Sequence, residues 1–373
     1  MNIAFFTTHP VNPYIGGIEK ITYNLAQYFK SQNIGIFYFH LKGENSNNHF
    51  ILPNFSNNYI AKFIDEKIIK HKIDIIIDQY GTNHYFSHEH LKSNIKIIRC
   101  IHSNITENHI TRCLLETFLY KKKKEQLINF LYWLNTPRRR QKQKKEYKYI
   151  IKNVDILCLL SQFYKNEYII NYPADNIVSI NNAIPMHHSN DEKKEKIIIY
   201  CGRMIHNPKN ILFLIHIWEQ LYTKYKDWKM ILVGDGEDRY IIENLIKKKK
   251  LPRISVTGFT DPTVYYQKAQ ILILPSYNEG FPMSLIEAMS YGCVPIVFNT
   301  VPAFQDIIKN GINGYIINEL HKKDFIEKCQ HLIENPFILK KFSQNARLHI
   351  IENFSLEKIG AQWINLFNIL LKK

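Results

Sequence analysis

The stretch ILILPSYNEGFPMSLIEAMSYGCVPIVFN, residues 271–299, contains two apolar runs separated by a turn and an amphipathic segment. Residues 271–276 have the pattern of a buried strand, and residues 277–282 have the glycine and proline of a turn. Residues 283–292 follow as a helix that ends at a glycine, and residues 295–299 begin another strand. A strand, a helix and a second strand in this order predict a parallel sheet.

The same alternation of apolar and helical segments extends through the chain on both sides of this unit. A polar stretch without apolar periodicity, residues 181–196, divides it into two sets and is predicted to be a linker. The strand candidates are residues 3–6, 34–39, 74–78, 95–102 and 155–161 in the first set, and 196–202, 229–235, 254–259, 271–276, 295–299 and 314–318 in the second. We therefore expect an α/β fold with two doubly wound, Rossmann-like parallel-sheet domains.

The expected domains span residues 1–185 and 190–352, and a final helix in residues 353–373 is expected to pack back on the N-terminal domain. This helix begins near Ser355, a suitable N-cap. Its apolar stripe has helical spacing and consists of Leu356, Ile359, Trp363, Phe367 and Leu370. Ligands of open α/β sheets bind beyond the carboxyl ends of the strands. Two such edges facing each other would form a cleft, and the motif residues should follow strands.

The positive charge of the chain is concentrated in one segment. The formal net charge is +16, and residues 121–152 contain 12 basic and two acidic residues. They lie in a helical pattern expected over residues 108–153, where lysines alternate with apolar side chains. This pattern favours an anionic membrane surface or an anionic acceptor, with a solvated face packed on the N-terminal domain as the alternative. The residues chosen for this surface are Lys121, Lys122, Lys123, Lys124, Arg138, Arg139 and Arg140.

The charge is not accompanied by a nucleic-acid recognition motif, so no nucleic-acid partner is expected. Six cysteines are scattered without a CxxC pair, which is typical of reduced cysteines in a cytosolic protein. No apolar run reaches the length of roughly 18 residues that spans a membrane. The first ten residues resemble a strand more than a signal peptide. We expect a cytoplasmic protein, peripheral on the inner face of the plasma membrane.

Two motifs in the N-terminal half follow strands. Gly16 and Gly17 precede a helical segment, where glycines let backbone N–H groups approach a phosphate. A plain tight turn is the alternative for this pair. His102 ends a strand, where its imidazole could act on a reacting hydroxyl or hold it in place. A hydrogen-bonded structural histidine is the alternative there.

The C-terminal half contains cations in the same kind of position. Arg203 follows a strand, and Lys209 comes six residues later at the expected start of a helix. A guanidinium fork and a point-like ammonium together suit a diphosphate, although two solvated surface cations are the commoner case. Gly234 follows the next strand in a turn that either lines the cleft or is purely structural. No paired carboxylates or zinc-spaced ligands are visible, so no metal cofactor is expected.

The turn and helix of residues 277–292 contain two glutamates. Glu279 lies beside Gly280, Phe281 and Pro282, where it could accept hydrogen bonds from ligand hydroxyls near backbone N–H groups. Glu287 falls inside the apolar helix, where an unpaired carboxylate would be costly to bury. It could bind the two hydroxyls of a ribose. The alternatives are a partner of the helix dipole for the first carboxylate and a surface glutamate for the second.

Together these segments resemble the retaining glycosyltransferases of family four, which have the GT-B architecture. The strongest resemblance is Glu279, seven residues and Glu287 within PSYNEGFPMSLIEAMSYGCVPIV. YCGRMIHNPKN, LVGDGED, VTGF and DIIKNGINGYII resemble other segments of the family, in its order, and IGGIEKITYNLA and CIHSN resemble its N-terminal loop and cleft histidine. The resemblance is specific over residues 198–318 and looser before them. One departure is Asp306, where many relatives have glutamate.

The resemblance implies a role for each matching residue. Arg203 and Lys209 would neutralise the diphosphate of the donor in place of a metal, with Gly16, Gly17 and Gly234 close to the donor. Glu287 would hold the ribose, and Glu279 with Gly280, Phe281 and Pro282 would hold the donor sugar. His102 would lie near the donor sugar and the acceptor hydroxyl. The family implies retention of anomeric configuration, with the departing phosphate helping to deprotonate the acceptor. The sequence itself indicates no dedicated general base.

The resemblance predicts a metal-independent hexosyltransferase. It would move a sugar from a nucleotide-diphosphate donor to a hydroxyl of a growing, lipid-linked bacterial surface glycan such as lipopolysaccharide or capsule. A nucleotide-sugar epimerase with the same two domains is one alternative, and it would turn over the donor without an acceptor. A non-catalytic protein that binds glycans or nucleotide sugars is the other, and the intact set of Arg203, Lys209, Glu279 and Glu287 argues against it.

Overall fold

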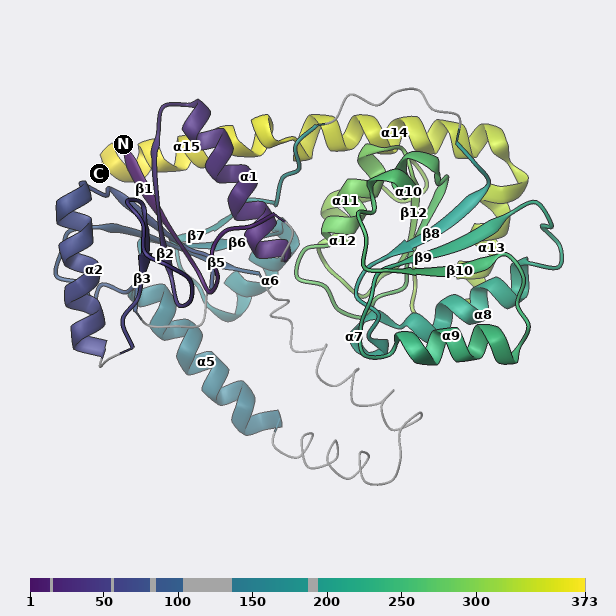
Figure 1. Cartoon of the computed structure of the whole chain (residues 1–373), viewed down its shortest axis with the longest axis horizontal. Helices are drawn as coiled ribbons and strands as arrows, with labels where there is room; N and C mark the ends of the chain where they lie inside the picture. The colour runs from purple at the N-terminus through teal and green to yellow at the C-terminus, as the bar shows by residue number, and fades with distance from the viewer. Residues whose placement is uncertain (14–15, 55–56, 81–84, 103–135, 187–193, 373) are drawn as a thin grey trace. The chain divides into compact units, whose positions relative to one another are not determined.

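The computed structural model describes residues 1–373 except 14–15, 55–56, 81–84, 103–135, 187–193 and 373. The described chain forms two compact units (Figure 1). The first unit comprises Met1–Ile105, Thr136–Pro185 and Phe354–Lys373, and the second comprises Met186–Asn353. Each unit is a parallel β-sheet covered by helices, which confirms the predicted α/β class.

The sheet of the first unit has seven strands in the order β3-β2-β1-β4-β5-β6-β7, all parallel. Five strands coincide with apolar runs of the sequence, and the short strands β3 and β7 were not predicted because their runs are too brief to show a period. The strands are β1 (Asn2–Thr7), β2 (Gly35–His40), β3 (His49–Ile51), β4 (Ile75–Asp78), β5 (Lys96–Ile101), β6 (Ile156–Leu159) and β7 (Ile177–Ser179).

The helices of the first unit include the C-terminal helix α15, which packs against α1. Phe367 of α15 meets Phe29 of α1 edge to face, with ring centroids 5.2 Å apart. Ser355 caps α15, because its Oγ accepts a hydrogen bond from the backbone N–H of Lys358 at 3.3 Å. The helices are α1 (Gly17–Ser31), α2 (Asn57–His71), α5 (Thr136–Lys152), α6 (Gln162–Asn171) and α15 (Leu356–Lys372).

The start of the predicted linker belongs to the first unit. Asn182, Ala183 and Ile184 are buried, and Ile184 exchanges backbone hydrogen bonds with the segment that leads into α15. The polar composition of this stretch predicted a linker. Its order depends on hydrogen bonds to residues 354–356, which are distant in the sequence and therefore not visible in the local pattern. The N-terminal part of the predicted basic helix lies outside the described residues, and its described part is α5.

The sheet of the second unit has six parallel strands in the order β10-β9-β8-β11-β12-β13. All six coincide with the predicted apolar runs. They are β8 (Ile197–Cys201), β9 (Lys229–Val233), β10 (Ile254–Gly258), β11 (Ile271–Leu274), β12 (Val294–Phe298) and β13 (Tyr315–Ile317). The helices are α7 (His206–Lys209), α8 (Ile211–Leu221), α9 (Arg239–Lys248), α10 (Thr263–Lys268), α11 (Met283–Ser290), α12 (Phe304–Ile307), α13 (Lys322–Glu334) and α14 (Pro336–Phe354).

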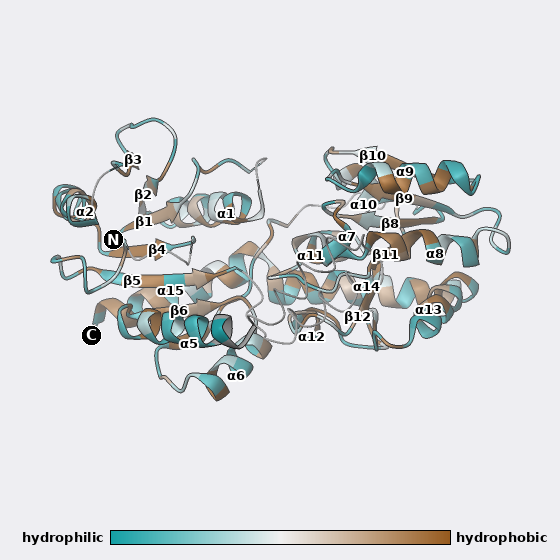
Figure 2. Ribbon diagram, turned by 90° about the horizontal axis from the view of Figure 1, so that it is seen from below, coloured by the Kyte–Doolittle hydropathy of each residue, from teal (hydrophilic) through white to brown (hydrophobic). Residues whose placement is uncertain are grey.

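Both cores are built from β-branched and aromatic strand residues. Figure 2 shows mainly hydrophobic strands, with helices whose outward faces are hydrophilic. Strand β11 illustrates the reason, since Ile271, Leu272 and Ile273 have no exposed surface on either face of the sheet. Among the described residues, no helix is long and apolar enough to cross a membrane.

Candidate functional site

The carboxyl ends of the strands in the second unit bring together most of the predicted residues. Arg203 and Lys209 follow β8, Gly234 follows β9 and Glu279 follows β11. Because all these strands are parallel, their following loops lie on one edge of the sheet, which is where open α/β sheets bind ligands.

The central contact at this edge is an ion pair between Lys209 and Glu279. The Nζ atom of Lys209 donates a short hydrogen bond to Oε2 of Glu279. Their side chains are 20% and 11% exposed, so solvent screens the pair only partly. The backbone N–H of Tyr277 donates to the carbonyl of Pro208 at 2.8 Å and joins the two loops. Lys209 ends the short helix α7, whereas the sequence pattern predicted it at the start of a longer helix.

Two further residues, missed in the sequence, hold Glu279 in place. The fully buried Ser276 donates from Oγ to Oε1 of Glu279 at 2.8 Å. Thr300, at the end of β12, donates from Oγ1 to the carbonyl of Ser276 at 2.6 Å. The available signal was a hydroxyl residue directly after each apolar strand run, but such residues are common in turns. Their role depends on the neighbouring strand, which the local sequence does not show.

Arg203 presents an exposed side chain at the same edge. Its backbone carbonyl accepts a hydrogen bond from the hydroxyl of the buried Tyr200 at 3.0 Å, which ties the loop to strand β8. Burial raises the pKa of Tyr200, and the nearby charge of Glu279 raises it further. Within the described part of the chain, no ion pair involves Arg203. Its guanidinium is therefore available to an anion.

Gly234 has a structural reason to be glycine. Its φ is +140°, and a Cβ there would lie 2.0 Å from the carbonyl oxygen of Gly202. The neighbouring Gly236 is equally restricted, because a Cβ would lie 2.5 Å from the carbonyl oxygen of Met204. These glycines let the β9 loop pack against the loop that carries Arg203. A direct contact between Gly234 and a donor stays a prediction.

Glu287 lies in the second turn of α11, and Pro282 forms the N-cap of that helix. Its side chain is half-buried near two tyrosines. The pKa of Tyr266 is raised by burial, then by Cys201 and by Glu287, and that of Tyr291 by burial, then by Asp261 and by Glu287. Glu279 lies in the preceding loop with Gly280 and the buried Phe281. The contacts proposed for these residues with ribose and sugar stay predictions.

The corresponding edge of the first unit carries His102 after β5. Its Nε2 donates to Oε1 of Gln79 at 2.6 Å, and Gln79 itself is buried after β4. Burial lowers the pKa of His102 to about 4, so the imidazole is neutral at pH 7. Gly16 is the N-cap of α1, and Gly17 is its first residue, where an added Cβ would meet open space.

The predicted basic surface is only partly described. Lys121, Lys122, Lys123 and Lys124 lie outside the described residues, as do the side chains of Arg139 and Arg140. Arg138 is exposed on α5. The same helix also exposes the following lysines, and among the described residues none of them forms an ion pair: Lys142, Lys144, Lys145, Lys148 and Lys152.

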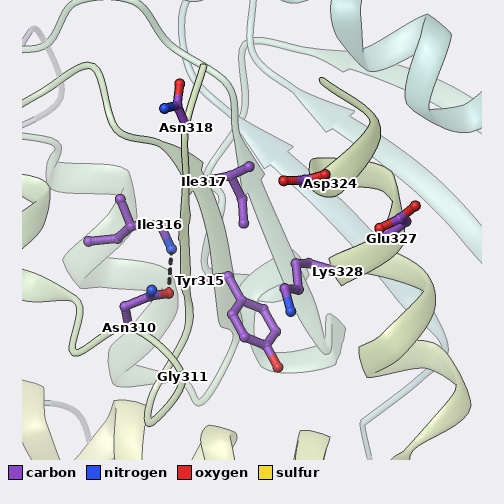
Figure 3. A pocket seen from close by; sticks show the side chains of 9 residues that line it. All are labelled: Asn310, Gly311, Tyr315, Ile316, Ile317, Asn318, Asp324, Glu327 and Lys328. Atoms are coloured by element: carbon purple, nitrogen blue, oxygen red, sulfur yellow. Dashed lines mark hydrogen bonds between the residues drawn. The ribbon is translucent and has the colours of Figure 1, made fainter. Parts of the chain in front are cut away.

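A surface pocket of about 560 Å³ lies between β13 and α13. In Figure 3, Asp324, Glu327 and Lys328 project from α13, while Tyr315 belongs to β13. The side chain of Asn310 accepts a hydrogen bond from the backbone N–H of Ile316 at 3.0 Å, which satisfies that edge of the strand. None of the catalytic, donor-binding or surface residues predicted from the sequence lines this pocket.

Comparisons with known proteins place similar sequences among glycosyltransferases. The model of the family described as glycosyl transferases group 1 matches residues 185–349. An uncharacterized glycosyltransferase of Haemophilus influenzae is 28% identical over 221 residues, which cover 58% of this chain and 62% of that protein. The poly(ribitol-phosphate) alpha-N-acetylglucosaminyltransferase of Staphylococcus aureus is 29% identical over 231 residues, which cover 60% of this chain and 47% of that protein. The matched segment thus spans less than two thirds of either relative.

A solved structure supports the architecture of the whole chain. The glycosyltransferase from Rickettsia africae superposes with a TM-score of 0.77 at 20% identity, over 100% of this chain and 99% of that one. At this identity the likeness concerns the fold alone. It confirms the predicted GT-B architecture with two Rossmann-like domains.

Proposed function

We propose that the chain is a glycosyltransferase, because the model of the family described as glycosyl transferases group 1 matches residues 185–349. It transfers a sugar from a nucleotide-diphosphate sugar to a hydroxyl of a growing surface glycan. The observation that carries the proposal is the ion pair of Lys209 and Glu279, which lies at the same sheet edge as the exposed side chain of Arg203. This edge offers cations to a diphosphate and a fixed carboxylate to sugar hydroxyls.

The reaction breaks the bond between the anomeric carbon and the diphosphate oxygen and forms a bond to the acceptor oxygen. The acceptor proton passes to the departing diphosphate, so the step needs no further reactant. Negative charge grows on the leaving group, and preorganised cations are a large electrostatic contribution in such steps. Arg203 and Lys209 supply these cations, and we propose that they do so without a metal and with retention of configuration.

The remaining residues position the two substrates. Glu279 accepts hydrogen bonds from the donor sugar, and Glu287 accepts them from the ribose. His102 takes part as a neutral imidazole, because its lowered pKa leaves it uncharged at pH 7. With Nε2–H donated to Gln79, its Nδ1 is the hydrogen-bond acceptor of the ring. Its neutrality supports a positioning contact with a hydroxyl more than a role as an acid.

A glycopolymer acceptor is supported by the relatives, one of which is named a poly(ribitol-phosphate) alpha-N-acetylglucosaminyltransferase. The exposed cations of α5 support the further proposal that the enzyme docks on an anionic cytoplasmic leaflet and uses a lipid-linked acceptor. Each Lys or Arg near such a surface contributes about 1 kcal/mol.

The catalytic proposal is tested with a panel of nucleotide-diphosphate sugars. Donors are first ranked by thermal shift, and release of the nucleoside diphosphate is then followed with and without glycan acceptors. Arg203→Ala and Glu279→Ala, checked for folding by circular dichroism, are expected to lose release by about 100-fold or more. Near wild-type rates in both variants would overturn the proposed site. Turnover of the donor without any acceptor would favour the epimerase.

The docking proposal is tested by pelleting the protein with phosphatidylserine vesicles at physiological salt. The triple variant Lys145→Gln/Lys148→Gln/Lys152→Gln is expected to lose most of its binding. The matched control removes three exposed lysines from the second unit, Lys247→Gln/Lys248→Gln/Lys250→Gln, and is expected to bind like the wild type. Equal binding by the wild type and both triple variants would exclude α5 as the docking surface.

A further inference from the structure

We propose that Glu279 also promotes release of the nucleoside diphosphate product, by competing with the diphosphate for Lys209. This inference rests on the proposed function and concerns the same site. It assigns to the carboxylate a task that begins once the sugar has left. The consequence is an unusual one for a binding residue, because removing its charge should strengthen the binding of the product.

The first observation is that Lys209 already has an anionic partner in the chain itself. Its ammonium is bonded to Glu279, in a position where solvent reaches little of either side chain. An exposed pair in the same unit, Lys224 and Glu334, has side chains that are 58% and 45% exposed. Screening is weaker for the less exposed pair of Lys209 and Glu279, so an arriving diphosphate has to share or replace the carboxylate.

The second observation is that the carboxylate stays in place when the lysine leaves it. Oε1 of Glu279 is held by Ser276, which Thr300 holds in turn. Glu279 therefore does not move away as Lys209 turns toward a diphosphate, and its negative charge remains beside the ligand. Two like charges at close range repel each other, which weakens the binding of the diphosphate.

The third observation concerns the residues next to each partner. The Nδ2 atom of Asn210 and the Oδ1 atom of Asn278 are buried and have no hydrogen-bond partner among the described residues. Burying an unpaired polar atom is unfavourable. The conformation with the ion pair closed therefore leaves both loops short of one hydrogen bond each. When Lys209 moves toward a ligand, the neighbouring loops can therefore shift without losing a hydrogen bond at either of these two amide atoms.

These observations suggest a cycle in which Lys209 binds the diphosphate while the donor sugar is present and returns to Glu279 after the sugar has been transferred. While the donor is bound, the sugar hydroxyls hydrogen-bond to Glu279 and offset the loss of its cation, so Lys209 is free for the diphosphate. After transfer these hydroxyls are gone, and the negative charge of Glu279 lies near a dianionic or trianionic product that competes for its cation. Recovery of Lys209 by Glu279 then lowers the affinity for the product. The enzyme therefore binds the intact donor more tightly than it binds the nucleoside diphosphate product.

The test uses isothermal titration calorimetry with inorganic pyrophosphate, which represents the diphosphate without a base or sugar. UDP, GDP and ADP are titrated in parallel to include the nucleoside. Glu279→Gln is expected to bind each probe about tenfold more tightly than the wild type. Lys209→Gln is expected to bind each about tenfold more weakly. The control Glu219→Gln removes the same charge from another Lys–Glu pair of this unit, with Lys249, and is expected to stay within about twofold of the wild type.

The outcomes separate the inference from the function on which it rests. Weaker binding by Lys209→Gln together with unchanged or weaker binding by Glu279→Gln would overturn product release and keep the diphosphate site. A gain in Glu279→Gln that Glu219→Gln reproduces would also overturn it, because net charge would then be the cause. Absence of any diphosphate binding to the wild type would overturn both. Glu279→Ala serves as the second variant if Glu279→Gln does not fold.

Discussion

The two units each place a carboxylate and a cation next to the carboxyl end of a strand, but they use the pair differently. In the first unit Asp78 and Arg99 are both 0% exposed, and Nε of Arg99 donates to Oδ2 of Asp78 at 2.9 Å. Arg99 also donates to the carbonyl of Phe86 at 2.8 Å. In the second unit Lys209 and Glu279 remain partly exposed, at 20% and 11%.

This difference in burial separates a structural pair from a pair that can exchange partners. A guanidinium enclosed between strands has no route to a ligand, so Arg99 and Asp78 organise the β4 and β5 ends that carry Gln79 and His102. An ammonium on a short helix at the sheet edge can turn toward a ligand. The first edge thus presents neutral groups and the second presents charges, although both belong to the same kind of sheet.

The largest effect is expected when the buried pair is broken. Arg99→Met leaves the charge of Asp78 buried without its partner, which should lower the free energy of unfolding by about 3–5 kcal/mol. Urea unfolding measures this loss. The double variant Arg99→Met/Asp78→Asn removes the uncompensated charge and should recover part of it. A single variant as stable as the wild type would contradict the structural role of the pair.

Breaking the partly exposed pair of Lys209 and Glu279 should affect activity more than stability. Lys209→Gln is expected to lower kcat by about 100- to 1,000-fold, because it removes a cation from the leaving group. Its free energy of unfolding should change by only about 1 kcal/mol. Lys249→Gln, which breaks the pair with Glu219, is the control and should leave kcat unchanged. A large loss of stability in Lys209→Gln would contradict the distinction between a structural pair, Arg99 and Asp78, and a functional pair, Lys209 and Glu279.

The neutral edge of the first unit should respond to acid. Burial lowers the pKa values of His40 and His102 to about 4, below the ordinary value of 6.5. Between these pH values the unfolded chain binds more protons, so the free energy of unfolding falls as the pH falls, by up to about 1.4 kcal/mol per pH unit for each histidine. Urea unfolding at pH 7.0 and pH 5.0 measures this dependence.

His102→Gln provides the comparison for the acid response. It removes one of the histidines whose pKa the fold lowers and should make unfolding less dependent on pH between 7.0 and 5.0. The stability of the wild type should level off above about pH 7.5, roughly one unit above the ordinary histidine pKa, where folded and unfolded histidines are both neutral. An identical dependence in wild type and variant would contradict the lowered pKa of His102.

The smallest effect is expected at the hydrogen bond that holds Glu279. Ser276→Ala removes one charge-assisted hydrogen bond, a change of about 1.5–3 kcal/mol at most and less where water replaces the hydroxyl. We expect a several-fold rise in KM for the donor, with a smaller change in kcat. Ser276→Thr should restore KM, because it keeps the hydroxyl. Loss of activity in both variants would indicate a packing defect instead.

Much of the fold could be predicted because its strands are buried on both faces. Runs such as residues 271–274 are apolar throughout, and each is followed by a turn signal. The strands β3 and β7 escaped prediction because three residues are too few to show a period. The order of residues 182–184 escaped because it depends on pairing with residues 354–356, about 170 positions away in the sequence.

The site could be predicted only as a set of residue types at strand ends. Charged residues after predicted strands indicated which segments would lie at the site, since loops after parallel strands share one edge of the sheet. These residues are Arg203, Lys209, Glu279 and Glu287. The partners of these residues were not visible, because they come from other strands. Ser276 and Thr300 are ordinary turn residues until the sheet brings β11 and β12 together.

The sequence by itself determined the α/β class, the two sheets and the resemblance of residues 198–318 to glycosyltransferases, because apolar periodicity and loop motifs are local properties of the chain. Only the tertiary structure decided which charges meet. It enclosed Arg99 and Asp78, which lie in neighbouring strands, and left Lys209 and Glu279, which lie after strands, partly within reach of solvent. Burial decides whether a charge is locked or exchangeable, and burial depends on the packing of segments that are distant in the sequence.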